Sequence, residues 1–267
     1  MSVSEMTRSF RSATKQYVLP AEHGGWFLWI GPFLLGALAA EHYTFDLLWL
    51  LLLIVAVYLS RQPLIIIVKA LTGRRARAEA VPAVKAFAAI AAVGAALFAV
   101  LLLRGHWGLT LLALPAGPVL AAQLWLVSQR KERQIGIELF GSGVLALSAT
   151  AAYWVSVGST DSTGWWLWLL SWLYNASAIV YVYTRLVQRR WNLVPPWSVR
   201  WQNGIRTLLY AGFNLALTFV LAAAGLLPGF VVVAYAFALL HFAYGIAFPC
   251  VHARPTRVGI EQSLATL

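Results

Sequence analysis

Long apolar runs separated by short polar segments dominate this chain of 267 residues. Each run is about long enough to cross ~30 Å of hydrocarbon as a helix that rises about 1.5 Å per residue. The pattern therefore predicts an all-α polytopic membrane protein with eight transmembrane helices. The expected spans are residues 24–41, 46–70, 82–103, 107–128, 135–157, 164–187, 206–226 and 229–249.

The polar segments are too short to form a separate soluble domain. None that lies between two runs exceeds about 25 residues, which cannot bury a core of its own. We therefore expect a basic N-terminal segment over 1–23, one membrane domain over 24–249 with an interfacial loop at 188–205, and a tail over 250–267. The tripeptide Ala-Leu-Ala at 37–39 resembles a signal cleavage site, but cleavage would leave an odd number of spans, so we expect the first span to be retained.

Positive charges gather on one side of the expected helices. Of the 20 Lys and Arg residues, all but Arg104 lie in segments that the spans bring to the same side. By the positive-inside rule this side is cytoplasmic and carries both termini. The net charge of +11 therefore reports orientation in a plasma (inner) membrane, and we expect membrane lipids rather than nucleic acid as partners.

Two short motifs recur at one spacing. Residues 133–139, RQIGIEL, share a Gly-Ile-Glu pattern with residues 256–262, TRVGIEQ, at an offset of 123 residues. The same offset aligns Tyr58 with Tyr181. The sequence thus predicts two parallel four-helix repeats about an axis near the membrane normal, and the alternative is chance similarity within an apolar composition.

Polar side chains follow one face of the second span and one face of the sixth. At spacings of three and four residues they line one side of each helix, and at membrane depth such a side must face protein or water. Arg61, Lys69 and Arg185 have an alternative role, because long basic side chains can reach the headgroups from within a helix. The two stripes are Tyr58, Arg61, Gln62, Ile65 and Lys69, and Ser171, Tyr174, Asn175, Ala178, Tyr181 and Arg185.

Further candidates are one carboxylate at a helix start and three polar side chains inside spans. Glu138 lies one turn into the fifth span, behind Lys131 and Arg133. A carboxylate at that position can face a binding site or simply interact with the helix N-terminus. The polar groups inside spans are more typical of interhelical hydrogen bonds than of ligand contacts, and they are Asn175, Asn214 and His241.

The expected loop at 188–205 mixes tryptophans with arginines around Pro195 and Pro196. Aromatic rings with basic neighbours suit the headgroup layer, where anionic lipids attract arginine. The same mixture can bind nucleic acid, but a loop tied to two spans favours the membrane surface. The residues concerned are Trp191, Trp197, Trp201, Arg189, Arg190, Arg200 and Arg206.

The segment AEHGGW, residues 21–26, places Glu22 and His23 at the cytoplasmic entrance of the first span. One His and one Glu are too few ligands for a metal, and the single cysteine, Cys250, excludes a thiolate cluster. No HExxH, CxxC or P-loop motif occurs. We therefore expect no metal and no cofactor, and an ordinary helix start is the alternative to a functional role for this segment.

Three segments carry a resemblance to a known family. PAEHGGW near the N-terminus, RKERQIGIEL after the fourth span and RPTRVGIEQS after the last resemble the YwiC-like family of bacterial membrane proteins. The resemblance covers most of the chain, and the His-Gly-x-Trp opening is its most distinctive part. It implies a membrane location but no established activity.

A more distant similarity links the chain to intramembrane prenyltransferases of the UbiA type. Those enzymes also have two four-helix halves, a cytoplasm-side cavity and key motifs after the second and sixth spans. They hold Mg²⁺ and a prenyl diphosphate through aspartate pairs, whereas this chain offers Arg61, Lys69 and Arg185 in those places. Since arginine can grip a phosphate directly but cannot hold a metal, the similarity implies a lipid phosphate without the magnesium chemistry.

Three functions are open on these grounds. The first is binding of an isoprenoid or phospholipid-type anionic lipid in a cytoplasm-facing pocket, with His23 as general acid or base in an enzymatic version and Glu22 or Glu138 orienting it. The second is a transporter with a midplane site, and the third is a non-catalytic membrane scaffold. The expected ligand-binding residues are Arg61, Gln62, Lys131, Arg133, Tyr181, Arg185 and Asn175.

Overall fold

The computed structural model describes residues 17–19, 24–129 and 135–253. Its main elements in these residues are helical, without a strand. They are η1 (Gly24–Trp26), α2 (Phe27–Ala39), α3 (Asp46–Leu71), η2 (Arg77–Glu79), α4 (Ala80–Leu103), α5 (Leu109–Ser128), α6 (Ile135–Val157), α7 (Ser162–Gln188), α8 (Trp197–Ala223) and α9 (Phe230–Ala247). The all-α prediction is confirmed for this part of the chain.

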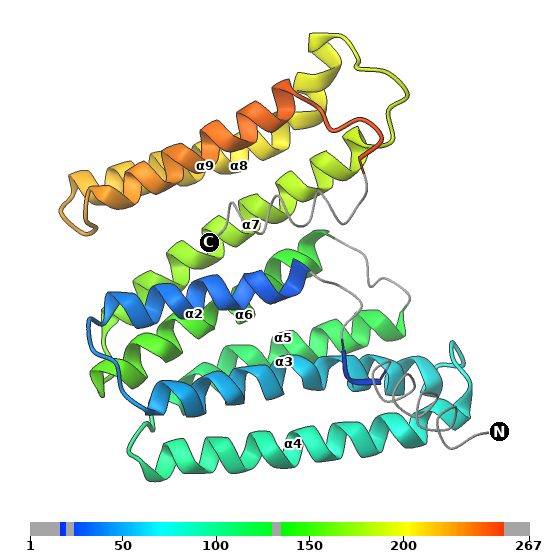
Figure 1. Ribbon diagram of the computed structural model, residues 1–267, viewed down its shortest axis with the longest axis vertical. Coiled ribbons are helices and arrows are strands. Elements are labelled where there is room, and N and C mark those ends of the chain that lie inside the picture. Colours follow the sequence, from blue (N-terminus) through cyan, green and yellow to red (C-terminus); the bar gives the residue numbers. More distant parts are fainter. Residues whose placement is uncertain (1–16, 20–23, 130–134, 254–267) are drawn as a thin grey trace, which may run out of the picture.

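The helices lie side by side in an elongated array (Figure 1). From one edge to the other come the α8–α9 pair, then α7, then α2 with α6, then α3 with α5, and finally α4. The C-terminal ends of α3, α5 and α7 and the starts of α4, α6 and α8 lie at one end, which we call the basic end because most of the described Lys and Arg residues lie there. The turns α2–α3, α4–α5, α6–α7 and α8–α9 meet at the opposite end. The helices therefore alternate in direction as a multi-pass chain requires.

Six of the described helical segments are long and apolar enough to cross a membrane. Helix α7 has 27 residues but is rich in Trp, Tyr and small polar residues, and α2 is apolar but has only 13. At about 1.5 Å per residue α2 is roughly 20 Å long, shorter than ~30 Å of hydrocarbon. The six segments are Asp46–Leu71, Arg77–Leu103, Leu109–Ser128, Ile135–Val157, Trp197–Ala223 and Phe230–Ala247. The chain is thus a multi-pass membrane protein by the length and composition of its helices.

Two helix boundaries differ from the predicted spans. Helix α2 ends at Ala39, and Glu41 has a φ of 55°, a left-handed conformation that ends the helix. Helix α8 begins at Trp197, nine residues before the predicted span at 206–226, so the connection from α7 is shorter than the segment 188–205. Polar residues in the first turns of α8 lower its hydropathy but do not break a helix, which is why an apolar window places the start too late.

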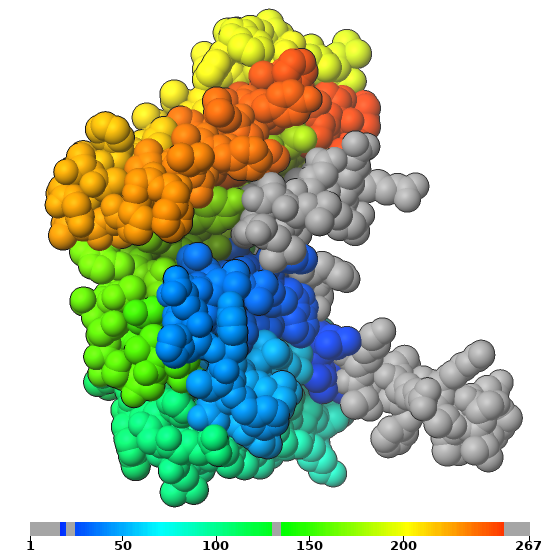
Figure 2. Space-filling view, turned by 60° about the vertical axis from the view of Figure 1, so that its left-hand side comes forward, coloured from blue at the N-terminus to red at the C-terminus, as the bar shows by residue number. Residues whose placement is uncertain are grey.

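Small residues allow the central helices to approach one another closely. Helix α2 packs along α6, and a Cβ atom at Gly36 of α2 would overlap the backbone carbonyl oxygen of Ala149 on α6. At Gly204 of α8 a Cβ atom would meet the side chain of Ile246 on α9. Helix α7 joins these two pairs by packing on α6, α8, α2 and α9. Figure 2 shows α2 and α9 on one face of the molecule.

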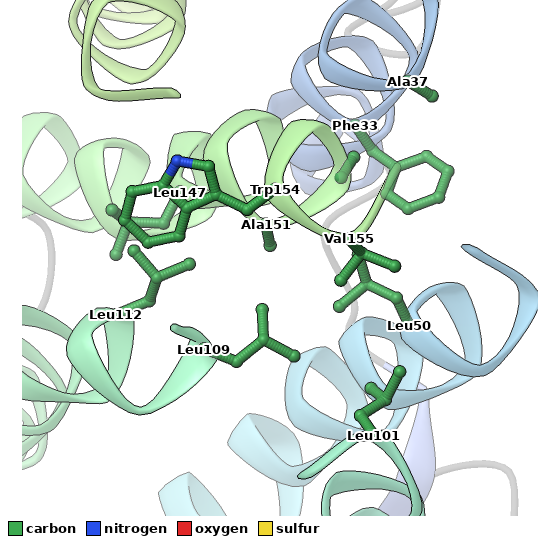
Figure 3. Close-up of a cluster of buried hydrophobic side chains, with 11 residues drawn as sticks. Phe33, Ala37, Leu50, Leu101, Leu109, Leu112, Leu147, Ala151, Trp154 and Val155 are labelled. Carbon is green, nitrogen blue, oxygen red and sulfur yellow. The ribbon is translucent and has the colours of Figure 1, made fainter. Parts of the chain in front are cut away.

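The largest apolar cluster lies toward the opposite end and joins five helices (Figure 3). Trp154, Val155 and Leu147 of α6 belong to it together with side chains from α2, α3, α4 and α5. Burial of large side chains of this kind stabilises a packed interior through close contact, in a membrane as in water. The other members are Phe33, Ala37, Leu50, Leu101, Leu109, Leu112, Ala151 and Ala152.

A proline in α2 explains one interhelical hydrogen bond. Pro32 has no N–H, so the carbonyl oxygen of Leu28, four residues earlier, lacks its usual intrahelical donor. The side-chain amide of Asn175 on α7 donates to this oxygen at 2.9 Å. Asn175 is fully buried, and its bond supplies the donor that the proline removes.

We therefore expect Asn175→Ala to lower the free energy of unfolding by about 1 kcal/mol, the usual size of an interhelical hydrogen bond in a membrane. In a Pro32→Ala background the same substitution is expected to cost clearly less, because residue 32 then offers its own N–H to Leu28. Equilibrium unfolding of the four proteins of this cycle in detergent measures the difference. An equal cost in both backgrounds would contradict the explanation.

Helix pairing differs between the two predicted halves. In the first half α3 packs chiefly on α4, and α2 packs on α6 of the other half. In the second half α6 packs on α7, and α8 packs on α9. One local similarity remains, because the hydroxyl groups of Tyr58 and Tyr181 each lie against a glycine, Gly25 and Gly245, of another element. The two-half repeat stays a prediction.

Candidate functional site

The polar stripe on α3 meets the start of α2. Tyr58 is buried, and the centroid of its ring lies 4.9 Å from that of Trp26 and 6.1 Å from that of Trp29. Its hydroxyl group packs so closely on Gly25 that a Cβ atom there would overlap it. Three aromatic rings therefore join the middle of α3 to the first turns at the start of α2.

Arg61 and Gln62 follow Tyr58 by one helical turn toward the basic end. Both side chains are half-buried on a helix that is long and apolar enough to span a membrane. A cation and an amide in such a position need polar neighbours. Glu22 and His23 lie outside the described residues, and in the sequence they directly precede η1, in which Gly25 packs against Tyr58.

Trp29 contributes a buried hydrogen-bond donor next to Tyr58. The residue is 2% exposed, and its indole N–H has no hydrogen-bond partner among the residues that the structure describes. Leaving such a donor unsatisfied costs about 1–3 kcal/mol. A hydrogen-bond acceptor that reached this N–H would therefore remove that cost and bind favourably.

Two contacts bring further elements together at the basic end. Arg74, just after α3, donates from Nη1 to the carbonyl oxygen of Val127 near the end of α5. Glu138, in the first turn of α6, accepts a hydrogen bond of 2.8 Å from the hydroxyl group of Tyr183 on α7. Lys131 and Arg133, which precede α6 in the sequence, lie outside the described residues.

Arg185 interacts with the C-terminal end of α9. Its Nη1 lies 2.7 Å from the carbonyl oxygen of Gly245, 3.0 Å from that of Phe248 and 3.0 Å from Oε1 of Gln188. The last carbonyl groups of a helix lack intrahelical donors and carry its negative dipole end, so a cation is favourable there. These contacts give Arg185 a structural role between α7 and α9.

The other candidate residues on α7, α8 and α9 contact neighbouring helices. Tyr181 stacks on Phe242 with 4.5 Å between ring centroids, and its ring lies 5.5 Å from that of His241. Asn175 and Asn214 each donate to a backbone carbonyl oxygen of another helix, at 2.9 Å and 2.7 Å. Donors used in this way hold helices together at the depth where a transport site was predicted.

The predicted ligand-binding residues thus fall into separate groups. Arg61 and Gln62 lie on α3, one turn from the Tyr58 that contacts Trp26, whereas Tyr181 and Arg185 pack against α9. Helices α2 and α6 stand between α3 and α7 (Figure 1). Asn175 contacts α2 from α7. In the set on α3, Tyr58 contacts the start of α2, and Arg61 and Gln62 follow it by one turn.

The opposite end contains a charged cluster that the sequence analysis did not predict. Asp46, at the start of α3, pairs through Oδ1 with Nε of Arg104 and through Oδ2 with Nε2 of His106 at 2.8 Å. The carboxylate and the imidazole are almost fully buried. Arg104 is the one basic residue that the charge pattern assigns to this side, and its pairing with Asp46 accounts for its position. The signal in the sequence was Arg104, as the single basic residue assigned to this side, together with Asp46 at the start of a predicted span.

The described residues contain no group of three or more His, Cys, Asp or Glu side chains that could hold a metal ion. Cys250 is half-buried and directs its thiol to the carbonyl oxygen of Arg185 at 3.4 Å. The polar groups around α3 are an arginine, an amide, a phenol and an indole, which are donors suited to an anion.

The antiparallel array of long apolar helices defines the class of the protein, an α-helical multi-pass membrane protein. The chain belongs to the YwiC-like family, described as YwiC-like protein, whose match covers residues 19–153, half of its length. The matched part includes α2, α3 and the polar stripe of α3. No curated protein and no solved structure matches the chain, and the similarity to UbiA-type prenyltransferases gains no support from these comparisons.

Proposed function

We propose that this YwiC-like membrane protein binds the phosphate group of an isoprenoid or phospholipid-type lipid in a pocket that opens toward the cytoplasm. The pocket lies at the junction of α3 with the start of α2. Arg61 grips the phosphate, Gln62 adds a second donor, and His23 and Glu22 form the wall contributed by the N-terminal segment. Lys131 and Arg133 add positive charge from the connection between α5 and α6.

The observation that carries the proposal is the half-buried Arg61 on a membrane-spanning helix, one turn from the Tyr58–Trp26 contact. A guanidinium group forms paired hydrogen bonds with a phosphate, and such charge-assisted bonds gain strength where water is scarce. An acyl or isoprenoid chain attached to that phosphate would be stabilised by the surrounding hydrocarbon. The ligand therefore combines an anionic head with an apolar chain.

Two further features support this location. The buried indole N–H of Trp29 lies in the same aromatic cluster and can donate to an oxygen atom of the ligand. The bond from Arg74 to Val127 ties the end of α3 to the end of α5, and Lys131 follows Val127 by four residues. In this proposal the basic residues of the two connections add positive charge that favours an anion.

Native mass spectrometry of the purified protein with its co-isolated lipids tests the proposal. The wild-type protein is expected to retain a phosphate-bearing lipid, and Arg61→Ala and His23→Ala are each expected to lose most of it. Arg61→Lys keeps the charge without the paired geometry and is expected to retain an intermediate amount. The matched control is Arg77→Ala, which removes an exposed cation of the α3–α4 connection and is expected to retain lipid like the wild type.

The thermal-unfolding midpoint in detergent separates loss of ligand contacts from loss of fold. Arg61→Ala is expected to keep a midpoint near that of the lipid-stripped wild type while losing lipid. Equal lipid retention by the wild type, Arg61→Ala and His23→Ala would rule out the pocket.

A further inference from the structure

The connection between α7 and α8 forms a second positioned surface at the basic end, where it loops out beyond α9 (Figure 1). Helix α8 has 27 residues and is about 40 Å long, more than the ~30 Å of hydrocarbon in a bilayer. Nη1 of Arg200 donates at 2.9 Å to the carbonyl oxygen of Ala247, the last residue of α9. The turn of α8 that precedes Arg200 therefore extends past the end of α9.

Hydrogen bonds from two sides hold this connection in place. Nε of Arg200 donates to the carbonyl oxygen of Pro195 at 2.8 Å, and its guanidinium carbon lies 5.5 Å from the centre of the Trp197 ring. From the segment after α9, the backbone N–H of His252 donates to the carbonyl oxygen of Arg189 at 3.1 Å. The His252 ring approaches another carbonyl oxygen of the connection at 3.2 Å. Arg200 and His252 thus act as internal braces.

The braced surface presents large apolar side chains. Leu193 is 82% exposed and Trp197 is 52% exposed, and Val194 and Trp201 are exposed beside them in the chain. Exposed apolar groups clustered in this way mark a contact surface. Tryptophan is the residue most typical of the boundary between headgroups and acyl chains, where its ring is apolar and its N–H can meet water or ester groups.

Exposed cations accompany these apolar groups. Arg190 and Arg206 are exposed, and their side chains make no hydrogen bond or ion pair within the described part of the chain. Helix α8 buries Gly204, Thr207 and Ala211 against its neighbours and leaves Arg206 on the other side. A long arginine side chain in this place reaches from the helix to the headgroup layer.

We propose that residues 189–206 form an interfacial anchor that binds anionic phospholipid headgroups of the leaflet at the basic end. Leu193, Val194, Trp197 and Trp201 enter the boundary between headgroups and acyl chains, and Arg190 and Arg206 pair with the phosphates. The charge complementarity of arginine with anionic lipid selects this occupant. Both ends of the surface continue into helices of the membrane domain, so it is held at the bilayer and away from soluble partners. The anchor is separate from the pocket at Arg61 and does not depend on it.

Fluorescence quenching in nanodiscs tests the anchor. A fluorophore is attached at position 198, an exposed site in the first turn of α8, in a Ser198→Cys, Cys250→Ser variant of the full-length protein. Headgroup-spin-labelled phosphatidylglycerol is expected to quench it more strongly than spin-labelled phosphatidylcholine at equal content. Arg190→Gln and Arg206→Gln are each expected to reduce this preference about fivefold, which corresponds to the contribution of about 1 kcal/mol from one basic residue near an anionic surface.

Arg77→Gln is the matched control, because it removes an exposed cation from the same end but outside the anchor. It is expected to leave the lipid preference at position 198 unchanged, and an unchanged thermal-unfolding midpoint verifies the fold of each variant. Equal quenching by the two lipids overturns the proposal. An equal loss of preference in Arg77→Gln also overturns it. Quenching by a water-soluble quencher, with no quenching by either lipid, overturns it as well and would indicate a docking surface for a soluble partner.

Discussion

Replacing Gly36 with alanine is expected to lower the free energy of unfolding by about 2–3 kcal/mol, near the upper end for an overpacked contact. A Cβ atom at this position of α2 would overlap the backbone carbonyl oxygen of Ala149 on α6. Backbone cannot move aside as a flexible side chain does, so the two helices must separate along their length. The contacts that α2 makes with the apolar cluster, through Phe33 and Ala37, would weaken with them.

Gly212→Ala provides the control for this experiment. Gly212 lies within α8, and a Cβ atom there would meet nothing within 4 Å. Alanine is more favourable than glycine inside a helix by up to about 1 kcal/mol, so Gly212→Ala is expected to stabilise the protein slightly. Equilibrium unfolding by sodium dodecyl sulfate in mixed micelles gives both values. If Gly36→Ala proved as stable as Gly212→Ala, the close approach of α2 to α6 would be wrong.

Replacing Arg185 with methionine is expected to cost about 3 kcal/mol of unfolding free energy. Methionine fills a similar volume but leaves the carbonyl oxygens of Gly245 and Phe248 and Oε1 of Gln188 without the donor they share. Removing one partner from a buried polar group costs far more than the net value of an exposed contact. The end of α9 would then lose its link to α7, and Arg185→Lys, which keeps one charged donor, is expected to cost less.

Two measurements separate this structural role of Arg185 from a ligand-binding role. Arg190→Met, at an exposed site nearby in the sequence, is expected to change the unfolding free energy by no more than about 0.5 kcal/mol. Lipid retention by native mass spectrometry is then compared with stability for each variant. A large loss of retained lipid in Arg185→Met without a loss of stability would show that the capping role assigned to Arg185 is wrong.

The basic residues of this chain have different roles, and their contacts in the structure distinguish these roles. Arg74, Arg185 and Arg200 each donate to a carbonyl oxygen at or near the C-terminal end of a helix at the basic end. Cations are favourable at such ends because of the helix dipole. These arginines belong to the group whose distribution predicts the orientation of the chain, and they also link helices at the basic end. The proposals rest on the half-buried Arg61 within α3 and on the exposed Arg190 and Arg206.

The fold could be predicted from sequence as far as it depends on local composition. A helix in hydrocarbon must be apolar along its whole length, so a long apolar run predicts where a helix lies. The helices from α3 to α7 fall close to the predicted spans for this reason. The start of α8 was placed too late because its first turns lie outside such a run while remaining helical. Helix existence and membrane burial are different properties, and hydropathy reports only the second.

The site could be predicted only in part. Periodicity indicates a polar stripe on α3 and another on α7, but it does not say whether a polar side chain meets a ligand or a backbone carbonyl. Asn175 illustrates this, because its partner Leu28 is 147 residues away and is available only because Pro32 lacks an N–H. The cluster of Asp46 with Arg104 and His106 was missed for the same reason, since its members come from separate elements about 60 residues apart.

The sequence by itself determined that the chain is a multi-pass helical membrane protein, the order and alternating direction of its helices, and the end at which its positive charges gather. These follow from the length of apolar runs and from the count of charges between them, both of which are local quantities. Only the tertiary structure decided that α2 packs on α6 through Gly36, that Arg185 donates to carbonyl groups at the end of α9, and that Asp46 pairs with Arg104. Such contacts depend on which helices become neighbours, and in a membrane many apolar surfaces are interchangeable, so close packing and hydrogen-bond geometry choose among them.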